Sequence, residues 1–133
     1  KPMIAVRETL ITAKGAAFAM GVCTNKSEPV AETILTELQL RSFFTDFVGA
    51  MPGRALKPDP EPLLLCAERI GTGDRRAVLI GDSIADVKAA RNAHMPCILV
   101  RGGYTNTAPE LLGANVVIDS FDHLFAALEQ LAA

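Results

Sequence analysis

Two acidic residues, Asp82 and Asp86, lie four residues apart just after a short apolar run, in the stretch VLIGDSIADVKAARNA. Acids at the start of a helix often only cap it or offset the partial positive charge of its end. Carboxylates are also ligands that Mg²⁺ takes, together with water and substrate phosphate. A spacing of four places both side chains on one side of the helix, and Gly81 leaves room for a ligand near the backbone. The residues therefore allow two interpretations, helix caps or metal ligands.

Three further polar residues could bind an anion. Lys57 lies in the proline-rich loop MPGRALKPDPEP, where a stiff backbone would fix an ammonium group that suits a phosphoryl oxygen, although such a lysine is often only a solvated charge. Thr24 and Asn25 follow an apolar run, and a hydroxyl with free N–H groups at a helix start forms an anion site. A turn between a strand and a helix also needs no function, so this second interpretation stays open.

Short apolar segments that predict strands alternate with segments of helical spacing. The predicted strands are 17–25, 46–50, 77–80, 97–100 and 116–118. The predicted helices are 28–40, 63–70, 84–94 and 121–131, and residues 102–113 are expected to form a loop with one helical turn. The first of these helices shows Val30, Ile34 and Leu38 at helical spacing, with Ser27 as its N-cap and Pro29 in its first turn. This alternation predicts an α/β fold with a parallel sheet covered by helices on both faces.

The expected sheet brings the candidate residues to one edge. Ligands of open α/β sheets bind beyond the carboxyl ends of the strands. Three polar groups follow successive predicted strands in this chain, namely Thr24 to Lys26, then Lys57, then Asp82 to Asp86. Each group alone is a weak signal, but their convergence favours a shared site.

The order of three motifs resembles a known family. VCTNK at 22–26, LKPDPEP at 56–62 and IGDSIADVKAARNA at 80–93 resemble the haloacid dehalogenase-like hydrolase superfamily, and most closely its phosphoglycolate phosphatases. The flanking stretches VRETL, RSFFTDFVG, GGY and VIDSFDHL also match, so the resemblance runs nearly from end to end. It implies a three-layer Rossmann-like parallel sheet, with residues 1–133 forming a single core domain.

The resemblance also implies a role for each candidate residue. Thr24 would donate its hydroxyl to the transferring phosphoryl group, assisted by Asn25, and Lys57 would neutralise charge on the nucleophile and the phosphate. Asp82 would bind Mg²⁺ directly, and Asp86 would act through water or by orienting Asp82. The implied function is a Mg²⁺-dependent phosphatase that acts on a small phosphorylated metabolite similar to 2-phosphoglycolate through an aspartyl-phosphate.

One part of the family pattern does not occur in this sequence. Such enzymes carry an Asp-x-Asp-Gly-Thr motif after a central first strand, and no Asp-x-Asp occurs in these 133 residues. The resemblance places that strand between the predicted strands 17–25 and 77–80, and it adds a cap domain that also has no counterpart here. We therefore expect a gap in the sheet and no activity from this chain alone. Because the chain opens with Lys1 rather than Met, we expect a preceding segment that supplies the missing strand. The alternatives are that another chain fills the gap or that the remaining strands close up.

Two rival functions remain. IGDSI also resembles the GDSL-type esterases, with Ser83 as nucleophile, but the residue three before His123 is Ser120 rather than the required aspartate. A non-catalytic protein that binds phosphate or metal, or that completes a sheet with a second chain, would account for the missing nucleophile directly.

Composition limits the partners and the compartment. The formal net charge is −2, with 13 basic and 15 acidic residues and no basic cluster, which argues against nucleic acid or an anionic membrane as partner. No apolar run approaches about 18 residues, so we expect no membrane span. The three cysteines, Cys23, Cys66 and Cys97, are odd in number and lie in or beside apolar segments, which predicts reduced core residues and a cytoplasmic protein.

Overall fold

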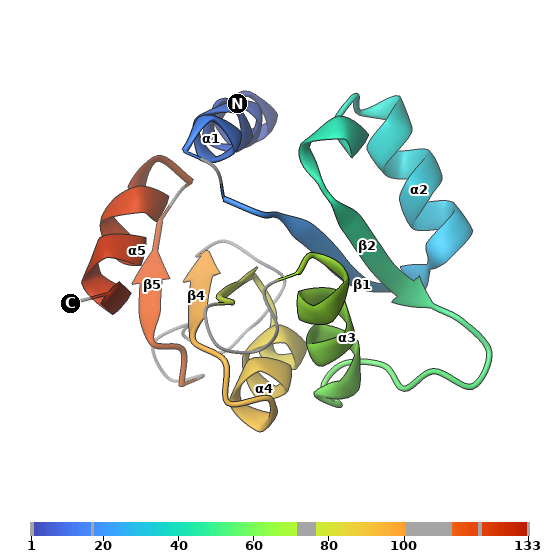
Figure 1. The fold of residues 1–133 in the computed structure, drawn as a ribbon. Helices are drawn as coiled ribbons and strands as arrows, with labels where there is room; N and C mark the ends of the chain where they lie inside the picture. The colour runs from blue at the N-terminus through green and yellow to red at the C-terminus, as the bar shows by residue number, and fades with distance from the viewer. Residues whose placement is uncertain (1, 17, 72–76, 101–112, 120, 133) are drawn as a thin grey trace.

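The computed structural model describes residues 2–16, 18–71, 77–100, 113–119 and 121–132 (Figure 1). The helices are α1 (Pro2–Gly15), α2 (Glu28–Glu37), α3 (Glu61–Arg69), α4 (Ile84–Asn92) and α5 (Leu124–Ala132), with short 3₁₀ turns η1 (Arg41–Phe43) and η3 (Phe121–His123). The strands are β1 (Gly21–Ser27), β2 (Asp46–Ala50), β3 (Leu79–Gly81), β4 (Cys97–Val100) and β5 (Val116–Ile118). The predicted α/β class is confirmed, with every strand pairing parallel to its neighbour.

The strands form two separate sheets. β1 pairs with β2, with Val22 opposite Phe47, while β3, β4 and β5 form a second sheet in which Ile80 lies opposite Ile98. In the described part of the chain, no strand pairs with the second edge of β1 or of β3. This is the gap that the sequence analysis expected between these two strands. The fold is therefore a parallel α/β core that is interrupted between β1 and β3.

Several predicted boundaries shift by a few residues. The first strand begins at Gly21 rather than at residue 17, which itself lies outside the described residues, and it continues to Ser27. The third strand is Leu79–Gly81 instead of 77–80. Helix α4 ends at Asn92, because Ala93 caps it and His94 takes a left-handed conformation with φ 57°. The predicted loop and helical turn at 102–113 lie almost wholly outside the described residues.

Helix α2 is confirmed, but the residues that indicated it are not the ones that it buries. Ala31 and Leu35 are buried against Phe47 of β2, whereas Val30 and Leu38 are 48% and 43% exposed. The Ser27 hydroxyl caps the helix by accepting a hydrogen bond from the Val30 N–H at 3.3 Å. The helix therefore faces β2 with the row formed by Ala31 and Leu35, and the adjacent row of Val30 and Leu38 lies toward solvent.

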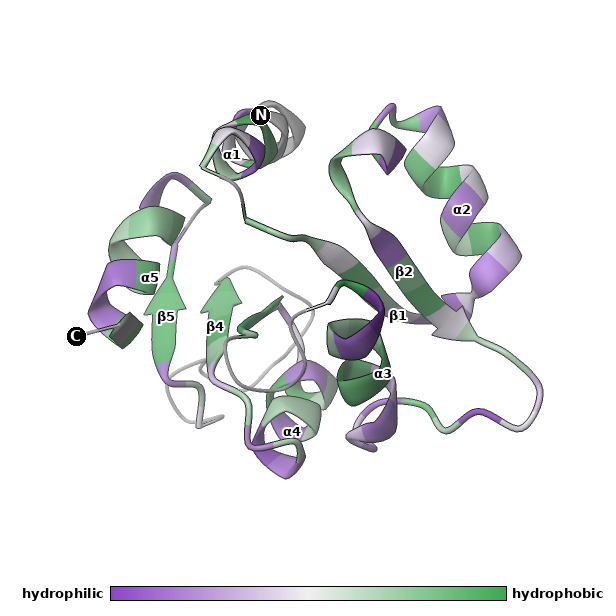
Figure 2. Cartoon of the chain, viewed as in Figure 1, coloured by the Kyte–Doolittle hydropathy of each residue, from purple (hydrophilic) through white to green (hydrophobic). Residues whose placement is uncertain are grey.

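The core of the three-stranded sheet lies between α4 on one face and α5 on the other. Ala89, Ala90 and Cys97 are buried in one cluster, while Ile98 and Leu124 belong to the cluster beneath α5. Hydrophobic residues fill β4 and β5 completely, as the hydropathy colouring shows (Figure 2). The apolar side of α5 is therefore part of the core.

A cavity of about 700 Å³ separates the two sheets. Its walls include the facing strands, with Val22 from β1 and Ile80 from β3, and also residues of α1 and α5. Lys57, Asp82 and Asp86 line the same cavity. The candidate residues therefore border the space that divides the two sheets.

The three cysteines are free thiols, and two of them are buried, as predicted. Burial is the main cause that raises the pKa of Cys66 and of Cys97 to about 12. Since only a thiolate acts as a strong nucleophile or metal ligand, these two side chains stay inert at neutral pH. They belong to the core rather than to a site.

Candidate active site

Lys57 lines the cavity and links its two sides. Its Nζ donates to the backbone carbonyl of Cys23, in β1, at 2.9 Å and lies 2.7 Å from Oδ1 of Asp86, in α4. The side chains of Lys57 and Asp86 are each only 10% exposed. A lysine that sequence reasoning left as a possible solvated charge is thus held in a nearly buried ion pair.

Asp86 is a fully engaged carboxylate. One oxygen, Oδ1, accepts from Lys57, and the other, Oδ2, accepts from the backbone N–H of Asp82 and from the Ser83 hydroxyl, both at 3.1 Å. An added Cβ at Gly81 would lie 2.5 to 2.7 Å from three atoms of the Asp86 side chain. Glycine at this position therefore makes room for Asp86 itself, and not only for an approaching ligand.

Asp82 differs from Asp86 in its surroundings. Its side chain is exposed, and within the described ranges no hydrogen bond or ion pair to its carboxylate is present. Its backbone N–H is held by Asp86, so the second acid fixes the main chain that presents the first. Of the two predicted metal ligands, Asp82 is the one whose oxygens are available to an incoming cation.

The Thr24–Asn25 segment contributes in two different ways. The Thr24 oxygen accepts a hydrogen bond from the Lys26 N–H at 3.1 Å, which leaves the hydroxyl proton with no acceptor among the described residues. The Asn25 amide binds the main chain of Lys57 twice: its Nδ2 donates to the Lys57 carbonyl at 3.1 Å, and its Oδ1 accepts from the Lys57 N–H at 3.0 Å. Asn25 is thus engaged with the loop, and its expected assistance at the phosphoryl group stays a prediction.

Three residues around the Lys57 loop were missed by sequence reasoning. The Asn92 amide donates to the Pro58 carbonyl at 3.1 Å, from the last turn of α4. Glu28 and Arg54 form an ion pair at 2.6 Å that joins the start of α2 to the same loop. None of these positions carries a motif that signals its partner, because each contact joins segments at least 26 residues apart.

The family model of the haloacid dehalogenase-like hydrolases matches residues 1–100, three quarters of the chain. This chain belongs to the haloacid dehalogenase-like hydrolases. The matched region contains all of the predicted site residues.

Its relatives within this hydrolase family include phosphoglycolate phosphatases. The chain is 40% identical over 120 residues to the phosphoglycolate phosphatase of Caulobacter vibrioides, covering 90% of this chain and 51% of that protein. It is 38% identical over 128 residues to that of Agrobacterium fabrum, covering 96% of this chain and 55% of the relative. The chain thus spans about half the length of the curated relatives it matches.

Solved structures of haloacid dehalogenase-like proteins share the fold. A predicted phosphoglycolate phosphatase from Haemophilus somnus superposes with a TM-score of 0.85 at 25% identity, covering 92% of this chain and 55% of that one. CbbY from Rhodobacter sphaeroides, crystallised with phosphate, superposes with a TM-score of 0.82 at 28% identity, covering 94% of this chain and 57% of that one.

The donor set of this hydrolase core fits Mg²⁺ better than a softer metal. Mg²⁺ keeps several water ligands and needs only one or two protein carboxylates, which an exposed Asp82 can supply. No cluster of three or more histidine, cysteine or acidic side chains occurs in the described part of the chain, so a structural zinc site is not formed there. Asp82 would hold the ion, and Asp86 would position the main chain that presents it.

The esterase alternative gains no support from the described geometry. Ser83 is the N-cap of α4, and its oxygen accepts from the Asp86 N–H at 3.3 Å. Across the described residues, no histidine hydrogen-bonds to Ser83, so the base that a nucleophilic serine requires is not in place. In addition, no helix of the described ranges has the length and apolar character needed to cross a membrane.

Proposed function

We propose that this chain is the core of a Mg²⁺-dependent phosphatase that acts on small phosphomonoesters of the 2-phosphoglycolate type. The observation that carries the proposal is the nearly buried Lys57–Asp86 pair in the cavity wall, which Asp82, an exposed acid, also lines. Membership of a hydrolase family and relatives named phosphoglycolate phosphatases support the same reaction class. The free thiols and the reduced compartment that they favour are consistent with a cytoplasmic enzyme.

In this proposal each residue has a defined task. The Lys57 ammonium offsets negative charge on the phosphate, and the Thr24 hydroxyl donates its proton to a phosphoryl oxygen. Asp86 holds the ammonium in place and fixes the main chain of Asp82. When bound at Asp82, Mg²⁺ would supply further positive charge against the phosphoryl oxygens.

In this proposal the nucleophile comes from outside these residues. Family resemblance assigns that role to the first aspartate of an Asp-x-Asp motif, which would form an aspartyl-phosphate, and this sequence has no such motif. We propose that the full-length protein supplies it in the space between β1 and β3. Accordingly, the purified 133-residue chain is expected to show no hydrolysis of 2-phosphoglycolate, while the full-length product is active with Mg²⁺. Turnover by a 133-residue product of verified mass, free of other phosphatases, would contradict this expectation.

Replacing Asp82 tests the metal assignment. In the full-length protein we expect Asp82→Asn to lower Mg²⁺-dependent kcat by about 100-fold or more, because the direct carboxylate ligand is lost. Unfolding stability should stay within about 0.5 kcal/mol of the parent, because Asp82 is exposed. Glu129→Gln, which removes an exposed acid from α5, is the matched control. Equal activity in the Asp82→Asn variant and the control would refute the assignment.

A second candidate is a non-catalytic protein that binds phosphate or metal, or that completes its sheet with another chain. The specific observation in its favour is that β1 and β3 each have one edge beside the cavity with which no described strand pairs, together with the lack of Asp-x-Asp in the sequence. Phosphate binding without turnover by the full-length protein would favour this candidate over the phosphatase.

A further inference from the structure

We propose that Glu28 and Arg54 are positioning residues that hold the loop carrying Lys57. This inference rests on the proposed phosphatase function, since it assigns a task to a contact behind that site. Arg54 lies in the loop between β2 and α3, three residues before Lys57. Glu28 is the first residue of α2, four residues after Thr24. The contact between them therefore joins the two segments that present candidate site residues.

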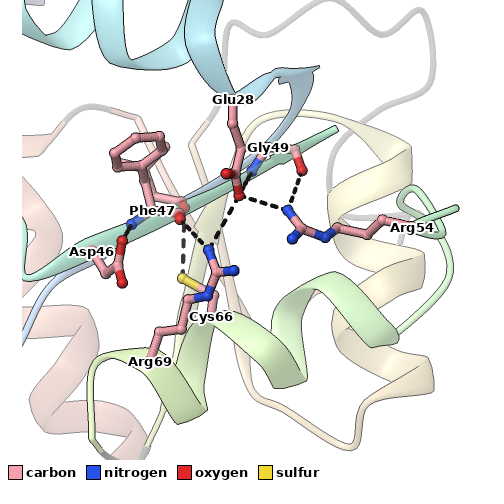
Figure 3. Close-up of polar contacts among 8 residues, drawn as sticks. Glu28, Asp46, Phe47, Gly49, Arg54, Cys66 and Arg69 are labelled. Carbon is pink, nitrogen blue, oxygen red and sulfur yellow. Dashed lines mark hydrogen bonds and ion pairs between the residues drawn. The ribbon is translucent and has the colours of Figure 1, made fainter. Parts of the chain in front are cut away.

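One oxygen of the Glu28 carboxylate collects three donors (Figure 3). Oε2 accepts from Arg54 Nη1 at 2.6 Å, from Arg69 Nη1 at 3.1 Å and from the backbone N–H of Gly49 at 3.2 Å. The side chains of Glu28 and Arg54 are only 20% and 17% exposed, so water screens this pair much less than a surface pair. The contact is a partly buried, charge-assisted tether between α2, the end of β2 and the loop.

The ionisation of Glu28 agrees with this arrangement. Burial tends to raise the pKa of the Glu28 carboxyl, but the hydrogen bonds from Arg54, Gly49 and Arg69 outweigh it and hold the pKa below its ordinary value. The carboxylate is therefore charged at neutral pH, and the tether to Arg54 is intact there.

The tether acts together with the Asn25 amide. Asn25 hydrogen-bonds to the main chain of Lys57 itself, and Glu28 forms an ion pair with Arg54, three residues earlier in the loop. Both anchors belong to the short segment that begins with Thr24. If Arg54 is released, the loop keeps a single anchor on this segment, and the Lys57 ammonium loses part of the support that keeps it against Asp86.

Arg69 offers an internal comparison because it also donates to Glu28 but lies in α3, outside the loop that carries Lys57. It lies at the end of α3, and the same Nη1 atom that reaches Glu28 also donates to the Phe47 carbonyl at 2.9 Å. Its loss would weaken the packing of α3 on β2 and leave the Arg54–Glu28 tether in place. A positioning role for the tether thus predicts different consequences for the two arginines.

The experiment compares Arg54→Met with Arg69→Met in the full-length protein, with Glu32→Gln, an exposed acid one turn further along α2, as control. The first readout is the rate at which an amine-directed acetylating reagent modifies Lys57 under native conditions, followed by peptide mass spectrometry. The second readout is kcat and KM for 2-phosphoglycolate.

We expect Arg54→Met to speed acetylation of Lys57 by about fivefold. We also expect it to lower kcat by about tenfold and to change KM by less than about twofold, because misplacement of the ammonium weakens transition-state stabilisation. Arg69→Met and Glu32→Gln should leave both readouts within about twofold of the parent. Arg54→Lys, which keeps a cationic donor toward Glu28, should restore part of the loss and serves as the measured variant if Arg54→Met does not fold.

Two results would overturn the inference. One is a rate of Lys57 acetylation equal to that of the parent in both Arg54 variants, and the other is equal effects of Arg54→Met and Arg69→Met on both readouts. The acetylation rate requires no turnover. If the full-length protein shows no phosphatase activity but Lys57 becomes more reactive in Arg54→Met, the proposed function fails and the positioning contact stands.

Discussion

Replacing Lys57 with methionine is expected to destabilise the chain by about 3 kcal/mol, because it leaves the buried charge of Asp86 without its partner. Asp86 is 7% exposed, and Lys57 provides its only ion pair in the described part of the chain. The same change also removes the ammonium that bridges β1 and α4, so it weakens the link between the two sheets. Urea unfolding followed by circular dichroism measures the effect.

A double-mutant cycle separates the pair from the individual side chains. In Lys57→Met with Asp86→Asn, the buried charge is absent, so the loss of stability should be clearly smaller than the sum of the two single losses. Lys88→Met, an exposed lysine of α4, is the matched control and should change stability by less than about 0.5 kcal/mol. If Lys57→Met were as mild as Lys88→Met, the ion pair could not be the link that we describe.

The second large effect is expected at Gly49, at the end of β2. A Cβ at this position would lie 2.7 Å from the Lys26 carbonyl oxygen and 2.8 Å from both Cα and N of Glu28. All three neighbours are main-chain atoms, so no side chain can rotate away, and β2 must move from the start of α2. We expect Gly49→Ala to cost about 2–3 kcal/mol of unfolding free energy.

Gly15→Ala is the control for this substitution, because the residue is helical and, among the described residues, nothing beyond its chain neighbours and the adjacent backbone of its own helix lies within 4 Å of the added Cβ. It should be neutral or slightly stabilising. Thermal unfolding of the two variants at the same concentration gives the comparison. Equal melting temperatures for Gly49→Ala and the parent would show that the close contact is not maintained in solution.

The fold was largely predictable because its signals are local. Short apolar runs such as the one at Cys97–Val100 stand between turn residues, and Ser27 and Pro29 mark a helix start. Periodicity did not predict α1, because its hydrophobic residues are not gathered on one side of the helix. The helix is instead packed near η3, where Thr9 donates to the Phe121 carbonyl at 3.5 Å. A contact between residues 112 positions apart leaves no periodic trace in either segment.

For the candidate site, the sequence predicts convergence better than it predicts contacts. Lys57, Asp82 and Asp86 are expected at one edge of the sheet, and the structure brings Lys57 and Asp86 into contact. The role expected for Asn25 at the phosphoryl group stays a prediction, while the hydrogen bonds of its amide to the Lys57 loop were not predicted. Which partner an amide selects depends on the path of a loop 32 residues away, and residue types do not encode that path.

The amide clamp has a consequence for engineering. The Asn25 amide hydrogen-bonds only to the main chain at position 57 and not to the lysine side chain, so these hydrogen bonds do not depend on which side chain stands there. The backbone at position 57 is therefore held in place whatever side chain it carries. An imidazole, a carboxamide or an unnatural metal-binding side chain introduced there would line the cavity, provided that residue 86 is changed to match its charge.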